Sequence, residues 1–342
     1  MFLSLYIIAP AYNEADGIRA FVARIGEIAD QHLYPRHIST VLVVIDDGSA
    51  DSTFQRIIDC DPSTRPGFSV TALRLSRNFG QQAAFQAGLE YAFRQAGPDS
   101  LFVLMDSDLQ HPPELIPRIV QCLQSGFDHV QMVRDETASL PLGKRLSSRL
   151  FYGLMQRLSG LAMPPGSSDF RGMSYRFLAA YLRFRETGRF NRGLFFWLGF
   201  PRCDLPYQAA ERQFGTTKYS AGKMLRLAAI ALTQFSSKPL VITSSATVIL
   251  SFGFCALYFL YTAVQFFRGV SFVMGWTSIV FIVSFWSGAL ALGQLVQSLY
   301  VSRLFDEIKS RPLYVVSDVN EAKTQPGDEA RTVAAAAPFK NN

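Results

Sequence analysis

Two acidic residues stand one residue apart at the end of an apolar run, where they could hold a divalent cation. Asp106 and Asp108 directly follow the apolar residues 101–105, and the side-chain amide of Gln110 comes two residues later. A short apolar run closed by turn residues is typical of a strand buried on both faces, and open α/β sheets bind ligands at the carboxyl ends of such strands. Oxygen ligands of this kind suit a hard cation that keeps positions open for phosphate oxygens. The alternative is a polar turn that caps the next helix, which the following Pro-Pro pair would begin.

A second acidic strand end favours a ligand site over an isolated turn. Asp46 and Asp47 end the apolar run at residues 41–45, and a glycine turn follows them. Both are ligand candidates, and Asp47 could accept a hydrogen bond from the N–H of a nucleotide base. Asp51, or the serine after it, is instead expected to cap a helix, because acidic and hydroxyl side chains are common just before a helix begins.

The elements that must position these acids follow an alternating pattern from the start of the chain to about residue 135. The expected strands are residues 5–9, 41–45, 70–75, 101–105 and 129–133. Helices are expected to begin after Glu14, Asp51, Gly80 and Pro113. This alternation specifies an α/β fold with a mostly parallel sheet and helices on both faces. The sequence has neither a glycine-rich dinucleotide fingerprint after the first strand nor a P-loop, which disfavours nicotinamide-binding and P-loop enzymes.

Later segments supply further charged candidates. Residues 76–82 follow the third expected strand and could order a nucleotide pocket or form a plain loop. Asp169 and Arg171 lie in a strand-like segment, where an internal ion pair and a functional role are both open. Arg212 and Lys218 flank a glycine-containing loop shortly before the apolar C-terminal part of the chain.

An apolar excess is concentrated in the C-terminal half. The chain has 342 residues, 49% of them hydrophobic, and a mean hydropathy of +0.15. Residues 239–267 contain no charged side chain, and neither do residues 269–302. Each stretch exceeds the ~20 residues that cross a hydrocarbon core, so we expect two membrane-spanning helices joined near Arg268. A buried helical hairpin is the alternative, but soluble helices of this length normally carry a polar stripe.

The distribution of basic residues predicts the orientation of these helices. The formal net charge is +6, and basic residues flank the apolar region on both outer ends, at Lys218, Lys223, Arg226, Lys238, Arg303, Lys309 and Arg311. The connection between the two apolar stretches carries only Arg268. By the positive-inside tendency both flanks are cytoplasmic. Basic residues beside a membrane indicate anionic lipid or phosphorylated substrates, and no nucleic-acid motif accompanies them.

These patterns divide the chain into four parts. Residues 1–219 form the expected catalytic domain, residues 220–238 a juxtamembrane amphipathic helix in the interface, residues 239–302 the transmembrane hairpin, and residues 303–342 a cytoplasmic tail that is disordered from about 321. Four cysteines without paired spacing predict neither a zinc site nor a disulfide framework, and they fit a reducing compartment. The first ten residues lack the features of a signal peptide and are expected to form the first strand.

Five ordered motifs together resemble glycosyltransferase family 2. They are Pro10-Ala11-Tyr12-Asn13-Glu14, Asp46-Asp47-Gly48-Ser49, Ser76-Arg77-Asn78-Phe79-Gly80, Asp106-Ser107-Asp108-Leu109-Gln110-His111-Pro112-Pro113 and Asp169-Phe170-Arg171. With the two apolar stretches, the chain resembles polyprenyl-phosphate glycosyltransferases, which are related to dolichol-phosphate mannose synthases and bactoprenol glucosyltransferases. The resemblance covers residues 3 to about 305 and implies a GT-A type, Rossmann-like sheet. Gly172 departs from the pattern, because leucine often follows the arginine of Asp-Phe-Arg.

The resemblance also implies roles for individual residues. The nucleotide-sugar site would comprise Pro10, Tyr12, Glu14, Asp47, Asp106, Ser107, Asp108, Arg134, Arg212 and Lys218, with Asp47 contacting the base edge. Mg²⁺ or Mn²⁺ would be held by Asp106, Asp108 and Gln110. Arg171, Arg212 and Lys218 would bind the acceptor phosphate. The catalytic group would be Asp106, Asp108, Asp169 and Arg212.

The implied reaction is an inverting sugar transfer from a nucleotide sugar to polyprenyl phosphate. The metal and the basic side chains would neutralise the departing nucleoside diphosphate while a lipid phosphate oxygen attacks the sugar C1 from the opposite face. A phosphate acceptor is already anionic, so a strong general base is less necessary than for a hydroxyl acceptor. UDP-glucose is the favoured donor, ahead of UDP-N-acetylhexosamine, a UDP-aminoarabinose derivative and GDP-mannose. The resemblance further implies a homo-oligomer in the bacterial inner membrane.

Two other functions compete with this one. A processive polysaccharide synthase would share the fold, but the Gln-x-x-Arg-Trp motif of those enzymes is missing from the sequence. A membrane protein that binds nucleotide sugars or moves lipids without catalysis is the alternative from another class. Uncharged apolar helices offer a poor path for a phosphorylated headgroup, and an inert binding protein would not need the paired acids.

Overall fold

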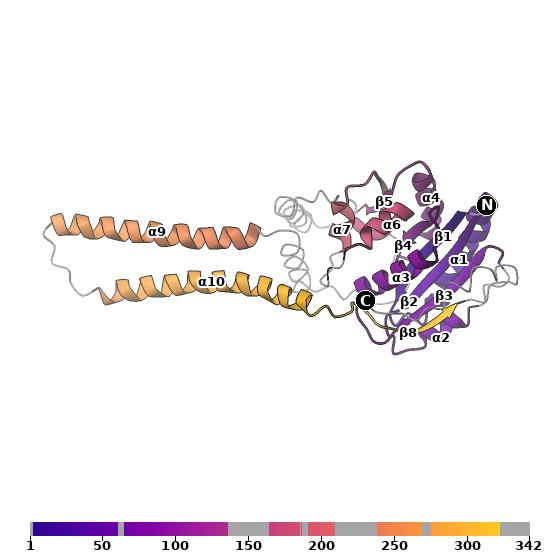
Figure 1. Cartoon of the computed structure of the whole chain (residues 1–342), viewed down its shortest axis with the longest axis horizontal. Coiled ribbons are helices and arrows are strands. Elements are labelled where there is room, and N and C mark those ends of the chain that lie inside the picture. Colours follow the sequence, from indigo (N-terminus) through magenta and orange to yellow (C-terminus); the bar gives the residue numbers. More distant parts are fainter. Residues whose placement is uncertain are drawn as a thin grey trace. The chain divides into compact units, whose positions relative to one another are not determined.

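A computed structural model describes residues 3–60, 65–135, 164–184, 186, 191–208, 238–268 and 275–321. The chain divides into two compact units, here called the sheet unit and the helix unit (Figure 1). The sheet unit comprises Met1–Gly153, Leu161–Tyr219 and Pro312–Asn342, and the helix unit comprises Leu154–Gly160 and Ser220–Arg311. The predicted amphipathic helix at residues 220–238 lies outside the described residues except for its last residue.

The sheet has the strand order β7-β5-β6-β4-β1-β2-β3-β8 among the described residues. The strands are β1 Leu3–Ala11, β2 Ile38–Asp46, β3 Phe68–Leu75, β4 Leu101–Leu104, β5 His129–Arg134, β6 Ser167–Ser174, β7 Arg202–Tyr207 and β8 Val316–Glu321. Strands β1 to β5 and β7 run in one direction, while β6 and β8 pair antiparallel with their neighbours. The prediction of a mostly parallel sheet is confirmed, and all five expected strands are present.

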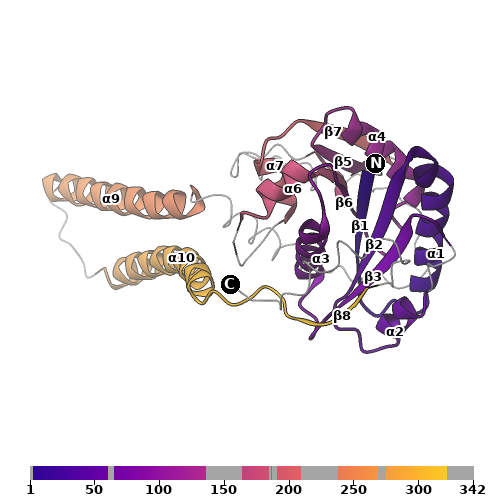
Figure 2. The same cartoon turned by 45° about the vertical axis from the view of Figure 1, so that its right-hand side comes forward.

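Helices cover both faces of the sheet, as predicted. The α-helices are α1 Ile18–Ile28, α2 Thr53–Ile58, α3 Gln81–Gln95, α4 Ile116–Gln124, α6 Tyr175–Tyr181 and α7 Asn191–Trp197, and the shorter helical turns are η1 Ala29–Leu33, η2 Tyr34–Arg36 and η3 Pro113–Leu115. Figure 2 shows α1 and α3 on opposite sides of the strands β1 to β3. The helices expected after Glu14, Asp51, Gly80 and Pro113 begin within a few residues of those positions.

The core explains why the strands are apolar without interruption. Leu5 and Ile7 of β1 are buried in a cluster with α1 and α4, whereas Ile8 points to the other face, toward α3. A Cβ atom added to Gly88 of α3 would lie 2.5 Å from Ile45 Cδ1 and 2.6 Å from Ile8 Cγ2. Glycine at this position therefore lets α3 pack directly on the sheet, and strands covered on both faces need apolar side chains on both.

Strand β8 differs from the sequence-based expectation of a tail after residue 302. It pairs antiparallel with β3 at the edge of the sheet, with Asp318 opposite Arg74. This strand is hard to predict from sequence, because the segment Val-Ser-Asp-Val-Asn-Glu is polar and mostly exposed, and so lacks the apolar pattern of a buried strand. The chain after the helix unit thus returns to complete the sheet.

The helix unit contains α9 Lys238–Phe267, which covers the predicted apolar stretch 239–267, and α10 Trp276–Ile308, which covers residues 276–302 of the second stretch. The two helices pack on each other, with the ring centroids of Phe254 and Phe285 5.9 Å apart. Among the described residues, Leu240–Gln265 is the one stretch long and apolar enough to cross a membrane, with a mean hydropathy of 2.0. The second predicted span, within α10, stays a prediction.

Candidate active site

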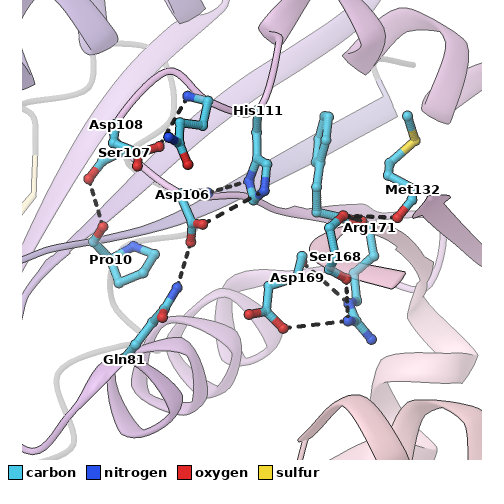
Figure 3. A network of polar contacts seen from close by, with 12 residues as sticks. Pro10, Gln81, Asp106, Ser107, Asp108, His111, Met132, Ser168, Asp169 and Arg171 are labelled. Atoms are coloured by element: carbon cyan, nitrogen blue, oxygen red, sulfur yellow. Dashed lines mark hydrogen bonds and ion pairs between the residues drawn. The ribbon is translucent and has the colours of Figure 1, made fainter. Parts of the chain in front are cut away.

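The carboxyl ends of β1, β2 and β4 meet at one edge of the sheet. Ala11, the last residue of β1, lies opposite Asp46, the last residue of β2. Ser107 lies beyond the end of β4, and its buried hydroxyl donates a 2.8 Å hydrogen bond to the carbonyl oxygen of Pro10 (Figure 3). The two predicted acidic strand ends are thus brought to one edge of the sheet by the parallel pairing.

Two side chains contact Asp106, one from the start of α3 and one from the turn after β4 (Figure 3). The Gln81 side-chain amide donates to Asp106 Oδ1 at 2.6 Å, and the Asp106 backbone N–H donates to His111 Nδ1 at 2.9 Å. Asp108 Oδ1 accepts from the Gln110 N–H at 3.1 Å. The helical turn η3 begins at Pro113 as predicted, but Pro112, not either acid, occupies its N-cap position, so the capping alternative does not describe these acids.

The electrostatics of this turn favour a bound cation. Burial, then the charges of Asp169 and Asp108, raise the pKa of Asp106 to about 8. Burial lowers the pKa of His111 to about 4, so its imidazole is neutral at physiological pH. Since His111 Nδ1 accepts a hydrogen bond, the ring proton lies on Nε2, 3.7 Å from Asp106 Oδ2. The two side chains that contact Asp106 directly, Gln81 and His111, are therefore both uncharged, and the positive charge of Arg192 acts on Asp106 from further away.

The donor set fits Mg²⁺ or Mn²⁺ with few protein ligands. No cluster of three or more His, Cys, Asp or Glu side chains with metal-binding geometry occurs in the part of the chain that the structure describes. Two carboxylates and an amide can nevertheless hold a hard cation that takes its other ligands from phosphate oxygens and water. Burial is the largest cause of the raised pKa of Asp106, and the charges of Asp169 and Asp108 add to it, so a cation bound here would favour the carboxylate over its protonated form.

Strand β6 brings Asp169 to the same edge. It pairs antiparallel with β4, with Arg171 opposite Leu104, which places Asp169 beside the turn that carries Asp106. Arg192 of α7 donates two hydrogen bonds to the Asp169 carboxylate, both 2.8 Å long. Although burial opposes ionisation, Arg192 and Arg171 hold the pKa of Asp169 well below its usual range. A carboxylate held this firmly as an anion is a poor general base.

Arg171 lies in the core, which contradicts its predicted contact with the acceptor phosphate. Its side chain is 0% exposed. The guanidinium donates to the Ser168 carbonyl oxygen at 2.8 Å, lies 3.7 Å from the Asp169 carboxylate and stacks 4.3 Å from the ring centroid of Phe195. The internal ion pair that the sequence left open is therefore the arrangement observed for Arg171.

Asp47 supports a neighbouring turn. The side chain is 3% exposed, and its two oxygens accept from the backbone N–H groups of Phe79 and Gly80 at 2.8 and 2.9 Å. Burial raises the pKa of Asp47, and these two hydrogen bonds act against that rise. Gly48 follows with φ +68°, and a Cβ there would lie 2.3 Å from the backbone of Arg77. Residues 76–80 are therefore fixed against the end of β2.

The segment after β1 is held in the same way. Asn13 adopts a left-handed φ of 54°, and its side-chain oxygen accepts from the Ala50 N–H at 3.0 Å. The Glu14 N–H donates to Thr53 Oγ1 at 2.9 Å. Tyr12 is 46% exposed beside these fixed residues, which leaves its ring accessible for stacking on a planar ligand.

Sequence comparisons place this geometry in a known family. Residues 6–182 match the model of Glycosyl transferase family 2. An uncharacterized glycosyltransferase of Synechocystis sp. is 32% identical over 322 residues, which is 93% of this chain and 96% of that protein. The chain belongs to glycosyltransferase family 2. The sequence-based resemblance is thereby confirmed, together with its GT-A type sheet.

Two further relatives of this family 2 glycosyltransferase carry more specific names. The SfII prophage-derived bactoprenol glucosyl transferase of Shigella flexneri is 29% identical over 317 residues, 92% of this chain and 97% of that protein. The undecaprenyl-phosphate 4-deoxy-4-formamido-L-arabinose transferase of Edwardsiella ictaluri is 29% identical over 327 residues, 94% of this chain and 96% of that protein. The similarity therefore extends through the helix unit as well as the sheet unit.

The predicted site residues of the glycosyltransferase fall into groups. Those at the carboxyl edge of the sheet and its loops are Pro10, Tyr12, Glu14, Asp47, Asp106, Ser107, Asp108, Gln110, Arg134 and Asp169. Arg134 is exposed at the end of β5, which runs parallel to β7 and antiparallel to β6. Arg212 and Lys218 lie outside the described residues.

Sequence reasoning missed three side chains of the site. Arg192 pairs with Asp169 across 23 residues, Gln81 contacts Asp106 across 25, and His111 accepts the Asp106 N–H. Gln81 lies in residues 76–82 and His111 in the motif after β4, both of which are candidate segments by sequence, so their positions could have indicated a role in the site. Arg192 had no comparable signal, because only the packing of α7 brings it to β6.

Proposed function

We propose that this glycosyltransferase transfers a sugar, with inversion, from a nucleotide sugar to polyprenyl phosphate at a membrane. The observation that carries the proposal is the pair of acids after β4, which lie beside the loops that follow β1 and β2. The same chain also has long apolar helices. Relatives along nearly the whole chain are named as bactoprenol and undecaprenyl-phosphate transferases, which supports a lipid phosphate as the acceptor.

In this proposal Asp106, Asp108 and Gln110 hold Mg²⁺ or Mn²⁺, which when bound supplies positive charge against the donor diphosphate. Tyr12 offers an exposed ring to the base. Ser107 fixes the turn after β4 to β1, so the acids keep their position while the donor binds. The basic side chains predicted near the phosphates, Arg134, Arg212 and Lys218, would add to the stabilisation of the leaving group.

The acceptor needs little help from a base. A phosphate monoester is anionic near neutral pH, so its oxygen can attack the sugar C1 without first losing a proton to the protein. Asp169 is ionised and bound by Arg192, which suits an electrostatic role in orienting groups at the edge better than proton transfer. The expected product is a polyprenyl-phosphate-linked sugar with inverted configuration at C1.

The helix unit would keep the enzyme at its lipid substrate. Apolar side chains of α9 and α10 are exposed along both helices, for example Phe252, Leu260, Leu292 and Leu299. Exposed apolar surface of this extent is stable in hydrocarbon and unfavourable in water. We therefore assign α9 and α10 as two spans of the bacterial inner membrane, with the sheet unit on the cytoplasmic side, where nucleotide sugars occur.

The donor is proposed to be UDP-glucose first. The named relatives differ in their sugars, one a glucosyl transferase and one a 4-deoxy-4-formamido-L-arabinose transferase, so family membership alone does not choose among them. A panel of radiolabelled donors, namely UDP-glucose, UDP-N-acetylhexosamine, a UDP-aminoarabinose derivative and GDP-mannose, would identify the sugar.

The decisive experiment uses the full chain purified in detergent with a short polyprenyl phosphate. Labelled sugar should move into the lipid fraction when Mg²⁺ or Mn²⁺ is present, and excess EDTA should stop the transfer. Transfer at full rate in EDTA would remove the metal role of Asp106 and Asp108. Absence of lipid product with every donor, while labelled polymer accumulates, would favour a processive synthase, and binding without any product would favour a non-catalytic protein.

A further inference from the structure

Gln81 makes a direct contact with Asp106, a proposed cation ligand. Its side-chain amide donates to Asp106 Oδ1 at 2.6 Å, and Figure 3 shows the side chain reaching from α3 to the carboxylate. Gln81 is the first residue of α3 and is itself exposed. An exposed, flexible side chain keeps such a contact only if its backbone is held in place, because ordering it costs conformational entropy.

Asp47 holds the backbone immediately before Gln81. Its oxygens accept the N–H groups of Phe79 and Gly80, and its own N–H donates to the Ala11 carbonyl oxygen at 2.9 Å. Gly80 adopts a φ of +93°, and its carbonyl oxygen accepts the first helical hydrogen bonds of α3. The turn at Phe79 and Gly80, which precedes α3, is therefore held through Asp47 to the ends of both β1 and β2.

The rest of α3 is also immobilised on the sheet. Gly88 packs against Ile8 and Ile45 so closely that an added Cβ would overlap both. Near its other end, Tyr91 donates to Glu321 of β8 at 2.7 Å. Because α3 is anchored at these points, the fold sets the position of the Gln81 backbone, from which the side chain reaches Asp106.

We propose that Gln81 is a positioning residue for the cation site, orienting the Asp106 carboxylate, and that Asp47 holds Gln81 in place through the turn at Phe79 and Gly80. The inference rests on the metal role given to Asp106 in the proposed function. In this inference Asp47 holds the turn before Gln81, which explains why both of its oxygens accept from backbone N–H groups. Partners of this kind, one step away from the metal, typically change metal affinity about 10- to 100-fold when removed.

The test measures Mn²⁺ binding to the full-length protein by electron paramagnetic resonance, without nucleotide or lipid. Gln81→Met keeps the length of the side chain but loses the amide donor, and it should weaken Mn²⁺ binding about 10- to 100-fold. Asp47→Asn should weaken Mn²⁺ binding in the same direction by a smaller factor, because asparagine retains one acceptor oxygen for two N–H groups. Gln55→Met is the matched control, since the Gln55 side chain on α2 donates a similar 2.9 Å hydrogen bond to Asp59, the residue after the end of α2.

Thermal unfolding of each variant separates positioning from misfolding. Unchanged Mn²⁺ affinity in folded Gln81→Met overturns the inference. Asp47→Asn that weakens UDP binding but leaves Mn²⁺ affinity unchanged overturns the part assigned to Asp47. In the double variant we expect an affinity no lower than that of Gln81→Met, because both changes act through one contact. If the losses of Mn²⁺ affinity in the two single variants add in the double variant, Asp47 does not act through Gln81. If Asp47→Asn fails to fold, Gln81→Met and Gln81→Leu decide the inference.

The outcome is separable from that of the proposed function. Transfer to polyprenyl phosphate by the wild-type protein tests the function, and it does not depend on the Gln81 variants. A wild-type protein that transfers sugar but binds no Mn²⁺ would overturn the inference and leave the reaction standing. A protein that binds Mn²⁺ through Gln81-oriented Asp106 but transfers no sugar to lipid would support the inference and remove the function.

Discussion

Charge pairing at the edge of the sheet separates two kinds of acid. Asp169 is paired with Arg192 through two hydrogen bonds and lies near Arg171, so its charge is balanced within the protein. Asp106 contacts the neutral side chains of Gln81 and His111. Burial and the charges of Asp169 and Asp108 oppose ionisation of Asp106, and the more distant charge of Arg192 offsets them only in part. Because a bound cation would reduce this repulsion, Asp106 is the acid suited to metal, and Asp169 shapes its surroundings.

This difference predicts a pH dependence for Mn²⁺ binding. Without metal the pKa of Asp106 is raised to about 8, so below that pH a proton must leave before the carboxylate can bind a cation. Affinity should therefore fall as pH decreases, by up to about tenfold per pH unit between pH 8 and 6, and level off above pH 8. Asp169 stays ionised throughout this range and adds no pH dependence. Mn²⁺ titrations monitored by electron paramagnetic resonance would measure it, and an affinity that is constant from pH 6 to 8 would contradict it.

Arg192 gives a second prediction at the scale of single residues. Arg192→Ala leaves the buried Asp169 carboxylate without its two charge-assisted hydrogen bonds, a loss of about 1.5–3 kcal/mol in the free energy of unfolding. We expect a lower melting temperature for the full-length protein in detergent. Arg192→Lys keeps the charge but not the paired geometry, so its melting temperature should lie between those of the wild-type protein and Arg192→Ala. The control is Arg19→Ala, because Arg19 and Asp59 form an exposed pair that should matter little. Equal melting temperatures for the Arg192 and Arg19 variants would show that the Asp169 pair is dispensable.

At the scale of elements, the packing of α4 on the sheet explains the departure of Gly172 from the family pattern. An added Cβ would lie 2.2 Å from Ile119 Cγ2 and 3.2 Å from Leu123 Cδ1. Both contacts are with α4, which lies over β6 at this point. A larger residue would require α4 to move away from the sheet, so the departure reflects close helix packing and leaves the neighbouring Asp169 undisturbed.

Substitution of Gly172 should therefore destabilise the sheet unit. Gly172→Ala overpacks the contact with Ile119 and is expected to cost about 1–3 kcal/mol, with Gly172→Leu costing more. Gly97→Ala is the matched control, because a Cβ at Gly97 would have nothing within 4 Å. Thermal unfolding in detergent should give a melting temperature several degrees lower for Gly172→Ala, since about 1 kcal/mol corresponds to roughly 2–4 °C in a domain of 150–250 residues. Two variants that melt together would mean that α4 accommodates the methyl group.

The elements most readily predicted from sequence are those buried on both faces. Residues 101–105 and 41–45 are unbroken apolar runs, and parallel pairing of such strands brings their acidic ends together, so both the fold and Asp106 could be anticipated. Strand β8 could not, because a polar edge strand has no periodic apolar signal. The burial of Arg171 also escaped prediction, because an arginine beside an acid has the same sequence pattern in a core pair and in a phosphate site.

At the scale of the whole molecule, the longer segment of the helix unit, Ser220–Arg311, is inserted in the chain between parts of the sheet unit. Strand β7 precedes α9 in the chain and β8 follows α10, yet both strands belong to one sheet. A sheet lies on one side of a membrane, so the chain between β7 and β8 must cross the membrane an even number of times. If α9 spans the bilayer, a second crossing must return the chain before β8, and α10 is the long apolar helix in position to make it.

Two crossings, together with the positive-inside tendency, predict that both ends of the helix pair are cytoplasmic and that the connection near Arg268 is external. The test replaces Cys60, Cys122, Cys203 and Cys255 by serine and introduces Gly269→Cys or Ser310→Cys singly into the active, full-length protein. A membrane-impermeant thiol reagent added to intact cells should label the protein carrying Gly269→Cys, whereas Ser310→Cys should react only after the membrane is opened. Reaction of Ser310→Cys but not Gly269→Cys in intact cells would invert the orientation. Protection of both positions until the membrane is opened would mean that the chain does not cross between them, so that α9 and α10 would lie on the membrane or pack within protein instead of spanning it.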